Sequence, residues 1–256
     1  MSRFRLYLLL LLMTGWSSAS LAQYQQFDVL VFSKTVGWHH DSINAGVNAI
    51  EHLGKKHNFS VTWTENAGLV FNDKALERFE AVVFLLTTGD VLDDEQQAVF
   101  ERFIRSGKGY VGIHSAADTE YKWDWYTALV GHMFAHHPPV QTATLKVEDP
   151  NFPGMDRFAP RFLFTDEWYE FDGARSKNLK YLLSIDESTY RVTPPRRKEA
   201  ETTPFHPISW YQEYDGGRSF YTALGHIAES FTDQHFLHHI YGGIYWAATG
   251  KGFKAK

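Results

Sequence analysis

Short, nearly continuous apolar runs occur at residues 27–32, 81–86 and 109–114, each bounded by glycine or polar residues. A strand that is buried on both faces has this composition, because neither face meets water. At residues 59–63 apolar and polar side chains alternate, as in a strand with one exposed face. The first half of the chain is therefore predicted to contain four strands.

Amphipathic helical periods separate these strands. Residues 43–53 place apolar side chains at helical spacing after Asp41, which we expect to cap the helix. Asp93 and Gln96 resemble a capping box before a second such helix, which Gly107 ends. Strands that alternate with helices predict an α/β fold with a mostly parallel central sheet, in which ligands bind beyond the carboxyl ends of the strands.

The regular alternation weakens between residues 121 and 205, where prolines are frequent. We interpret this part as an irregular insertion with strands at residues 140–147 and 179–185 and an exposed loop at residues 193–203. Strand and helix patterns alternate again near the C-terminus, with a predicted strand at residues 219–224 and a predicted last helix at residues 233–249.

The first residues have the pattern of a secretory signal. A basic start precedes a short apolar run at residues 6–13, and Ser20-Leu21-Ala22 offers a small-x-small cleavage pattern. An uncleaved anchor is the alternative, but a membrane span needs about 20 apolar residues. We therefore expect a signal peptide at residues 1–22, a single domain at residues 23–256, secretion or periplasmic export, and no membrane contact after cleavage.

Charge and cysteine content exclude several function classes. The formal net charge is −5, and cleavage would remove Arg3 and Arg5 and make it −7. Since a phosphate backbone requires a basic face, we expect no nucleic-acid partner. The chain has no cysteine, so it can use neither a thiolate nucleophile nor a cysteine-ligated metal.

Several of the thirteen histidines fall where predicted strands end. His39 and His40 follow the first strand, His114 ends the fourth, and His226 follows the strand at residues 219–224. Imidazole has an unperturbed pKa near neutrality, so grouped histidines suit proton transfer or metal binding. We expect a polar site lined by histidines at the carboxyl ends of the strands. The alternative is that Trp38 and the histidines beside it only pack over their loop.

The segment Gly112-Ile113-His114-Ser115-Ala116 lies where related α/β enzymes place a strained nucleophile turn. Its centre is a histidine, which argues against serine-hydrolase chemistry. Asp118 could orient His114 or another imidazole, or it could form a simple turn. His132 and His136 have the spacing of half a zinc site, but a loop packed by its own imidazoles is the favoured interpretation.

Aromatic residues gather in the irregular part of the chain, among them Trp123, Trp168, Tyr169 and Trp210. Flat rings suit stacking on sugars, although core packing explains most of them equally well. Glu167 lies beside these rings and could act as an acid, a base or a metal ligand, or it could belong to a solvated turn.

Taken in order, these motifs resemble the ThuA-like family, named for trehalose utilisation, in the class I glutamine amidotransferase-like superfamily. The motifs are residues 37–43, 112–126, 131–138, 166–169, 206–207 and 217–226, which span nearly the whole chain after residue 22. The resemblance implies a flavodoxin-like three-layer sandwich in which the superfamily cysteine is absent and His114 lies near its place. An amidotransferase is therefore excluded.

The resemblance also implies disaccharide or glycoside catabolism, with a small-molecule carbohydrate as partner. The hypothesis is hydrolysis or elimination of a glycoside or its 3-keto form, since a ketone at C3 acidifies the C2 proton for a positioned base. His114 and His40 would transfer protons, and Asp118 would orient an imidazole. Substrate contacts are expected from Trp38, His39, Glu167, His206 and His226.

Two alternatives stay open: a non-catalytic periplasmic sugar-binding protein, and a metal-dependent hydrolase of an ordinary ester or glycoside. The sequence identifies no cofactor. A divalent metal is the one candidate that the histidines admit, and its ligands are undetermined. Assembly into a homo-oligomer is also undetermined.

Overall fold

The computed structural model describes residues 25–192 and 205–253. The predicted cleavage site after Ala22 and the predicted loop at residues 193–203 lie outside this part. Within it, no helix combines the length and the apolar character that crossing a bilayer requires.

A nine-stranded sheet forms the centre of the described molecule, in the order β2-β1-β3-β4-β11-β10-β9-β6-β7. Its parallel half consists of β2 (Ser60–Thr64), β1 (Asp28–Phe32), β3 (Ala81–Leu85), β4 (Gly109–Ile113) and β11 (Gly217–Thr222). Antiparallel pairing then adds β10 (His206–Tyr214), β9 (Lys180–Ile185), β6 (Gln141–Val147) and β7 (Arg161–Asp166). Because four antiparallel steps separate β11 from β7, these two strands point the same way.

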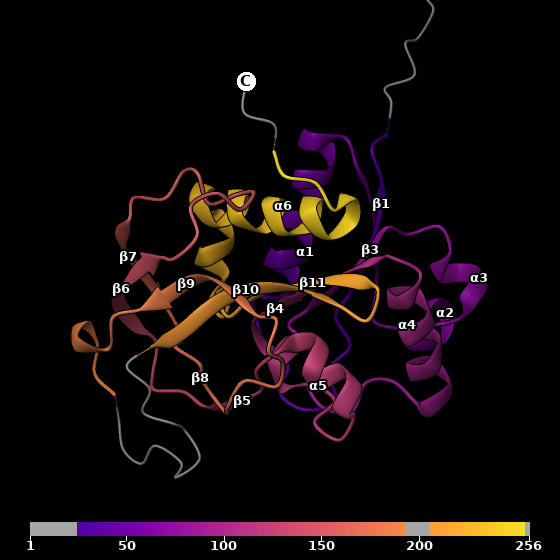
Figure 1. Ribbon diagram of the computed structural model, residues 1–256, viewed down its shortest axis with the longest axis horizontal. Coiled ribbons are helices and arrows are strands. Elements are labelled where there is room, and N and C mark those ends of the chain that lie inside the picture. The colour runs from indigo at the N-terminus through magenta and orange to yellow at the C-terminus, as the bar shows by residue number, and fades with distance from the viewer. Residues whose placement is uncertain (1–24, 193–204, 254–256) are drawn as a thin grey trace, which may run out of the picture.

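Helices cover both faces of the sheet (Figure 1). On one side lie α1 (Ile43–His57) and α6 (Gln234–Thr249), and on the other lie α4 (Asp94–Arg105) and α5 (Asp124–Val130). The remaining elements are short: α2 (Ala67–Val70), α3 (Asp73–Leu76), β5 (Phe134–His136), β8 (Glu170–Phe171), and the 3₁₀ turns η1 (His114–Asp118), η2 (Glu187–Thr189) and η3 (Ala228–Thr232). The α/β sandwich with a mostly parallel sheet is confirmed.

The apolar runs that were predicted to be buried strands form buried strands of the central sheet. Every residue of β3 and β4 is buried, because helices cover both faces of these central strands. The predicted capping box is also confirmed, since the Asp93 side chain accepts from the Gln96 amide and the Gln96 side chain accepts from the Asp93 amide.

The predicted cap of α1 by Asp41 is wrong. Ser42 occupies the N-cap position, and its side chain makes no capping bond. Its hydroxyl donates instead to the carbonyl of Gly225, 3.1 Å away in the loop after β11. A tertiary contact therefore takes the place of the local cap and joins two loops at the carboxyl edge of the sheet.

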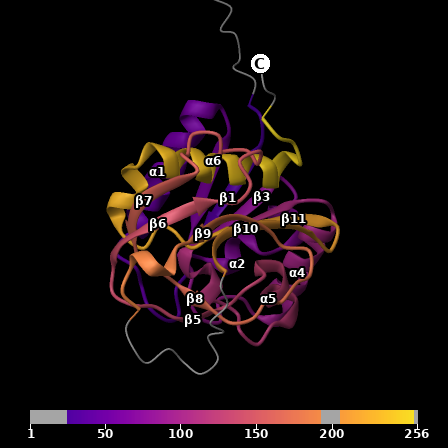
Figure 2. The ribbon, with the colours of Figure 1, turned by 60° about the vertical axis from the view of Figure 1, so that its left-hand side comes forward.

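The irregular segment contributes to the sheet as well as to its edge. Its predicted strands at residues 140–147 and 179–185 are confirmed as β6 and β9, and both extend the central sheet. When the molecule is turned, this extension lies beneath α6 and beside β10 (Figure 2). The loops after β1, β4, β11 and β7 therefore open at one edge.

Candidate functional site

His114 begins the turn that follows β4. Its backbone has φ +53°, a left-handed conformation that costs a non-glycine residue about 1–3 kcal/mol and that is often found at functional sites. The ring is completely buried, and Nδ1 lies 2.7 Å from the carbonyl oxygen of Ala223. A carbonyl can only accept, so Nδ1 carries a proton and Nε2 is the ring nitrogen that faces the site.

His226 is held in the loop after β11. Gly225 before it has φ +113°, which glycine adopts at little cost. The buried carboxylate of Asp166 accepts from the backbone amides of Gly225 and His226, at 2.8 and 3.1 Å. These bonds place His226 Nδ1 3.1 Å from Nε2 of His114.

Glu167 follows β7 and brings a buried carboxylate to the two imidazoles. Its Oε2 lies 3.1 Å from Nδ1 of His226 and 3.5 Å from Nε2 of His114, and its Oε1 lies 2.8 Å from Nδ1 of His137. Burial alone would raise the pKa of Glu167, but hydrogen bonds from His114, His137 and His226 hold that pKa far below its usual range. The carboxylate is therefore ionised, and its hydrogen bond raises the pKa of His137.

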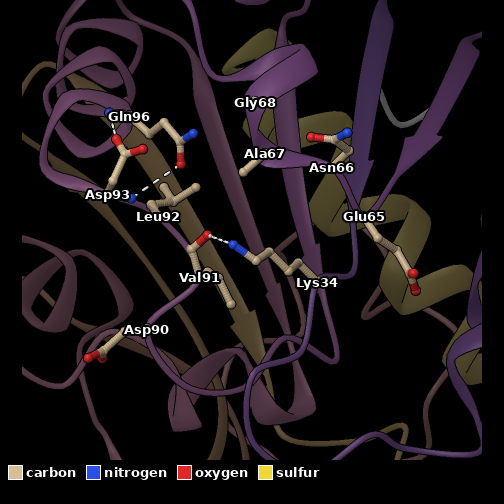
Figure 3. Close-up of a pocket in the computed structure, with 10 residues that line it drawn as sticks. All are labelled: Lys34, Glu65, Asn66, Ala67, Gly68, Asp90, Val91, Leu92, Asp93 and Gln96. Atoms are coloured by element: carbon tan, nitrogen blue, oxygen red, sulfur yellow. Dashed lines mark hydrogen bonds between the residues drawn. The ribbon is translucent and has the colours of Figure 1, made fainter.

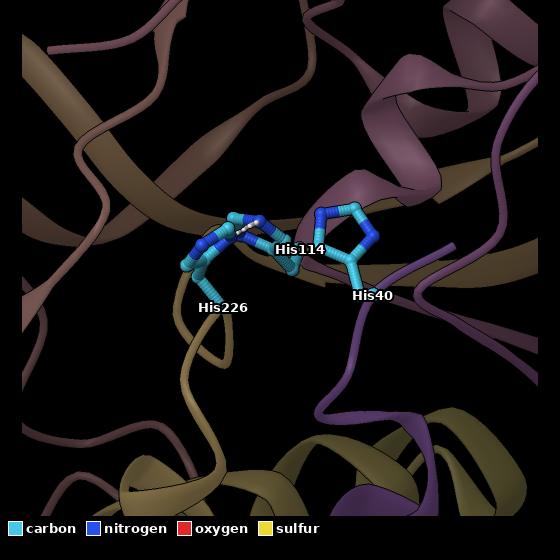
Figure 4. Close-up of side chains that lie close together, drawn as sticks. All are labelled: His40, His114 and His226. Carbon is cyan, nitrogen blue, oxygen red and sulfur yellow. Dashed lines mark hydrogen bonds between the residues drawn. The ribbon is translucent and has the colours of Figure 1, made fainter. Parts of the chain in front are cut away.

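His40 reaches the same place from the loop after β1. Its ring stands edge-on to those of His114 and His226, with centroids 5.0 and 5.3 Å away (Figure 4). Burial lowers the pKa of His40 to about 3, and the neighbouring imidazoles of His114 and His226 add to this effect. His40 is therefore neutral at ordinary pH and able to accept a proton or bind a metal.

These groups lie at the inner end of a cavity of about 670 Å³. Its lining consists of Trp38, His40, Asp41, Ser42, Asp118, Phe134, His137, Glu167, Tyr169, His226, Ile227, Ala228 and Glu229. Trp38 is 71% exposed, and Tyr169 packs against the ring of His114 with centroids 4.2 Å apart. The cavity thus combines an imidazole and carboxylate end with aromatic walls.

The structure brings together six of the eight predicted site residues: Trp38, His40, Asp118, Glu167 and His226 line the cavity, and His114 lies directly behind it. The carboxylate of Asp118 accepts from the Tyr121 hydroxyl at 2.7 Å. The predicted orienting bond to His114 is instead made by the carbonyl of Ala223.

Two predicted contacts lie elsewhere. His39 is exposed, and its Nδ1 is 3.1 Å from the Thr35 hydroxyl, whereas the adjacent His40 is buried in the site. His206 is buried, with Nε2 bound to the carbonyl of Tyr169 and Nδ1 3.1 Å from Glu187. It supports the Tyr169 wall from behind and does not line the cavity.

His132 and His136 do not lie on one face of a helix, as half a zinc site with their spacing would require. The helix α5 ends at Val130, and His136 belongs to β5. His132 is bound at both ring nitrogens, by the carbonyl of Asp172 and by the hydroxyl of Tyr181. Both partners lie in segments 40 or more residues away, so the favoured interpretation, a loop packed by its own imidazoles, does not describe His132.

Sequence reasoning missed His137 and Asp166 as site residues. His137 follows β5 in an irregular segment, where no periodicity assigns a side chain to a face. Asp166 is the last residue of β7, and its contacts with Gly225 and His226 join segments about 60 residues apart. The only signal was their place in the motifs at residues 131–138 and 166–169.

A second hollow, of about 610 Å³, lies near the ends of β1, β2 and β3 (Figure 3). Its principal polar groups are already paired. Lys34 donates to the carbonyl of Val91 at 2.7 Å, and Asp93 with Gln96 forms the capping box of α4. The histidine cavity is therefore the stronger candidate site.

Comparison with known proteins gives a consistent result. The family model ThuA, described as trehalose utilisation, matches residues 28–247. Among curated proteins, no relative matches the chain.

Two solved structures share the fold along nearly their whole length. A putative ThuA-like protein from Bacteroides uniformis has a TM-score of 0.72 at 19% identity, covering 92% of this chain and 98% of its own. A second, from Parabacteroides merdae, has a TM-score of 0.71 at 18% identity, covering 91% and 93%.

A β-galactosidase from Bacillus circulans also matches, with a TM-score of 0.53 at 11% identity, over 84% of this chain and 30% of that one. At these identities the likenesses establish the fold alone.

Proposed function

We propose that this chain, which belongs to the ThuA family of trehalose utilisation, cleaves a glycoside or 3-keto-glycoside in the histidine cavity. Membership of the family indicates a role in sugar metabolism. The cleavage reaction is inferred from the site.

One observation carries the proposal: imidazoles and a carboxylate from loops far apart in the chain converge at one end of a cavity with aromatic walls. His40 is neutral because it is buried, whereas His137 is paired with the ionised Glu167. Two titratable groups whose surroundings favour opposite protonation states are the arrangement that acid and base catalysis needs.

The site would act on a 3-keto-glycoside as follows. The imidazole of His40 removes the C2 proton, which the neighbouring ketone has acidified. The electron pair of the C2–H bond forms the C1–C2 double bond as the bond from C1 to the glycosidic oxygen breaks. Protonated His137 gives its proton to the departing oxygen. The products are the free alcohol and an unsaturated keto sugar, to which water can then add.

The wall of the cavity supports a carbohydrate as the substrate class. Trp38, Phe134 and Tyr169 offer ring faces, and Asp118 and Glu229 offer carboxylates that can accept from hydroxyls. Rings with polar neighbours suit the apolar face and hydroxyl edge of a pyranose.

We also propose that the protein acts outside the cytoplasm, after cleavage at residue 22, on a small-molecule carbohydrate and without a nucleic-acid partner. The basic, apolar and small-residue pattern of the first residues supports export, and the acidic net charge supports the choice of partner. Mass spectrometry of the protein from the extracellular or periplasmic fraction tests the cleavage: a chain that retains residue 1 would contradict it.

Release of p-nitrophenol from p-nitrophenyl glucoside and from its 3-keto derivative tests the reaction. Wild-type protein should cleave the keto derivative, and His40→Ala should be slower by roughly 10²–10⁴-fold, the usual contribution of a general base. His39→Ala, which changes the exposed neighbour in the same loop, is the matched control and should retain the wild-type rate. Sugar binding without turnover of either compound would overturn catalysis and favour the sugar-binding alternative.

A further inference from the structure

Three potential ligand atoms from three strand ends form a small triangle beside the cavity. His114 Nε2 and His226 Nδ1 are 3.1 Å apart, and Glu167 Oε2 lies 3.5 and 3.1 Å from them. In a tetrahedral zinc site with bonds of about 2.0–2.1 Å, neighbouring ligand atoms are about 3.3 Å apart. The three side chains are therefore already spaced as metal ligands.

An ion of this size also fits between them. The point equidistant from the three atoms lies about 1.9 Å from each, so an ion at about 2.0–2.1 Å would sit slightly outside their plane. His40, across from the imidazoles of His114 and His226, has a ring nitrogen within 4.8 Å of their nearest nitrogens. The open coordination position can therefore face His40 and the cavity.

The buried carboxylate of the triangle favours a bound cation. Nδ1 of His114 donates to the carbonyl of Ala223, so Nε2 is the ring nitrogen that points toward the Glu167 carboxylate, 3.5 Å away. A buried carboxylate beside imidazole nitrogens is stabilised when a proton or a metal ion lies between them. One metal ion can bind His114, His226 and Glu167 at the same time, whereas one proton can be shared by only two of these side chains.

The surroundings support metal binding. The second ring nitrogen of His114 is fixed by Ala223, and the second oxygen of Glu167 is held by His137 at 2.8 Å. Asp166 fixes the His226 backbone. Metal ligands are commonly oriented by outer partners of this kind, whose loss weakens metal affinity about 10–100-fold.

We propose that His114, His226 and Glu167 bind one divalent transition-metal ion of the Zn²⁺ type, with its open position toward His40. Two imidazoles and a carboxylate with a free position are the ligand set of catalytic zinc sites. The inference deepens the proposed function and rests on it only for the ion's role, which would be to bind the ketone oxygen and stabilise the negative charge that develops there as the C2 proton leaves. The binding itself rests on the geometry.

Metal analysis of the full protein tests the site without any substrate. Protein stripped with a chelator should bind one equivalent of Zn²⁺ in calorimetry, and one equivalent of Co²⁺ should give visible absorption bands of a nitrogen and oxygen site. Glu167→Gln and His226→Ala should abolish stoichiometric binding, and His137→Ala should weaken it about 10–100-fold. His39→Ala is the control and should bind like wild type. Circular dichroism of each variant verifies folding.

Two results would overturn the site: no stoichiometric binding of Zn²⁺ or Co²⁺ by folded wild-type protein, or equal binding by folded Glu167→Gln and wild type. The test separates this inference from the proposed function. Turnover of the keto-glycoside by metal-free protein would refute the metal's role and leave the reaction standing. Stoichiometric metal binding without turnover would support the site and refute the reaction.

Discussion

Replacement of Asp166 by alanine tests how the fold holds the site together. Its buried carboxylate accepts from the backbone amides of Gly225, His226 and Glu167, at 2.8, 3.1 and 2.9 Å. The Ser230 hydroxyl donates a fourth bond at 3.0 Å. Alanine would leave these donors buried without an acceptor, beneath the loops that carry His226 and Glu167.

The expected loss of stability follows from this network. Each buried donor left without a partner costs roughly 1–3 kcal/mol, but four donors around one carboxylate do not add independently. We therefore expect Asp166→Ala to lower the free energy of unfolding by about 4 kcal/mol, which is more than the cost of one unpaired donor and less than the sum of four. For a chain of this size the thermal midpoint should fall by on the order of 10 °C.

Urea unfolding followed by tryptophan fluorescence measures this change. Asp166→Asn keeps the shape but turns an amide N–H₂ toward some of the donors, so its loss should be of similar sign and smaller. Glu95→Ala, an exposed change on α4, is the surface control and should stay within about 0.5 kcal/mol of wild type. If Asp166→Ala unfolds at the same urea concentration as wild type, the carboxylate does not hold these loops.

Three further predictions concern the cavity rim, the site loop and a buried histidine. Trp38→Ala should raise KM for the keto-glycoside about three- to tenfold at unchanged kcat, since ring stacking is worth about 0.5–1.5 kcal/mol; an unchanged KM would remove Trp38 from the binding surface. Gly225→Ala should lower the free energy of urea unfolding by about 1–3 kcal/mol, because φ is +113° and the added Cβ would lie 3.0 Å from the Phe231 ring. Burial lowers the pKa of His239 to about 3, so the unfolded state binds more protons between about pH 6.5 and 3, and stability falls as pH falls through that window. His239→Phe should make this slope in urea unfolding shallower by up to about 1.4 kcal/mol per pH unit, and an unchanged slope would refute the assignment.

The strands could be predicted because their signal is local. The runs that form β1, β3 and β4 are apolar at every position that helices cover, and no distant residue is needed to recognise them. The cap of α1 could not be predicted in the same way. Ser42 bonds to Gly225, which lies 183 residues further along the chain, and no local pattern reports that contact.

The sequence predicted that a histidine-lined site forms, but it identified only some of the residues in that site. Histidines at strand ends indicated a polar site at the carboxyl edge, and His40, His114 and His226 meet there. His39 and His40 are neighbours with equal chemistry, and only the path of the loop decides which one turns inward. His137 enters the site through an irregular segment whose position depends on its pairing with Glu167.

The central claim is that the convergent histidines form a catalytic site, and the release of p-nitrophenol from the 3-keto-glycoside by wild-type, His40→Ala and His39→Ala proteins tests it most directly. The account predicts turnover by wild type and His39→Ala, and a rate at least about 100-fold lower for His40→Ala. Equal rates for wild type and a folded His40→Ala protein would contradict it.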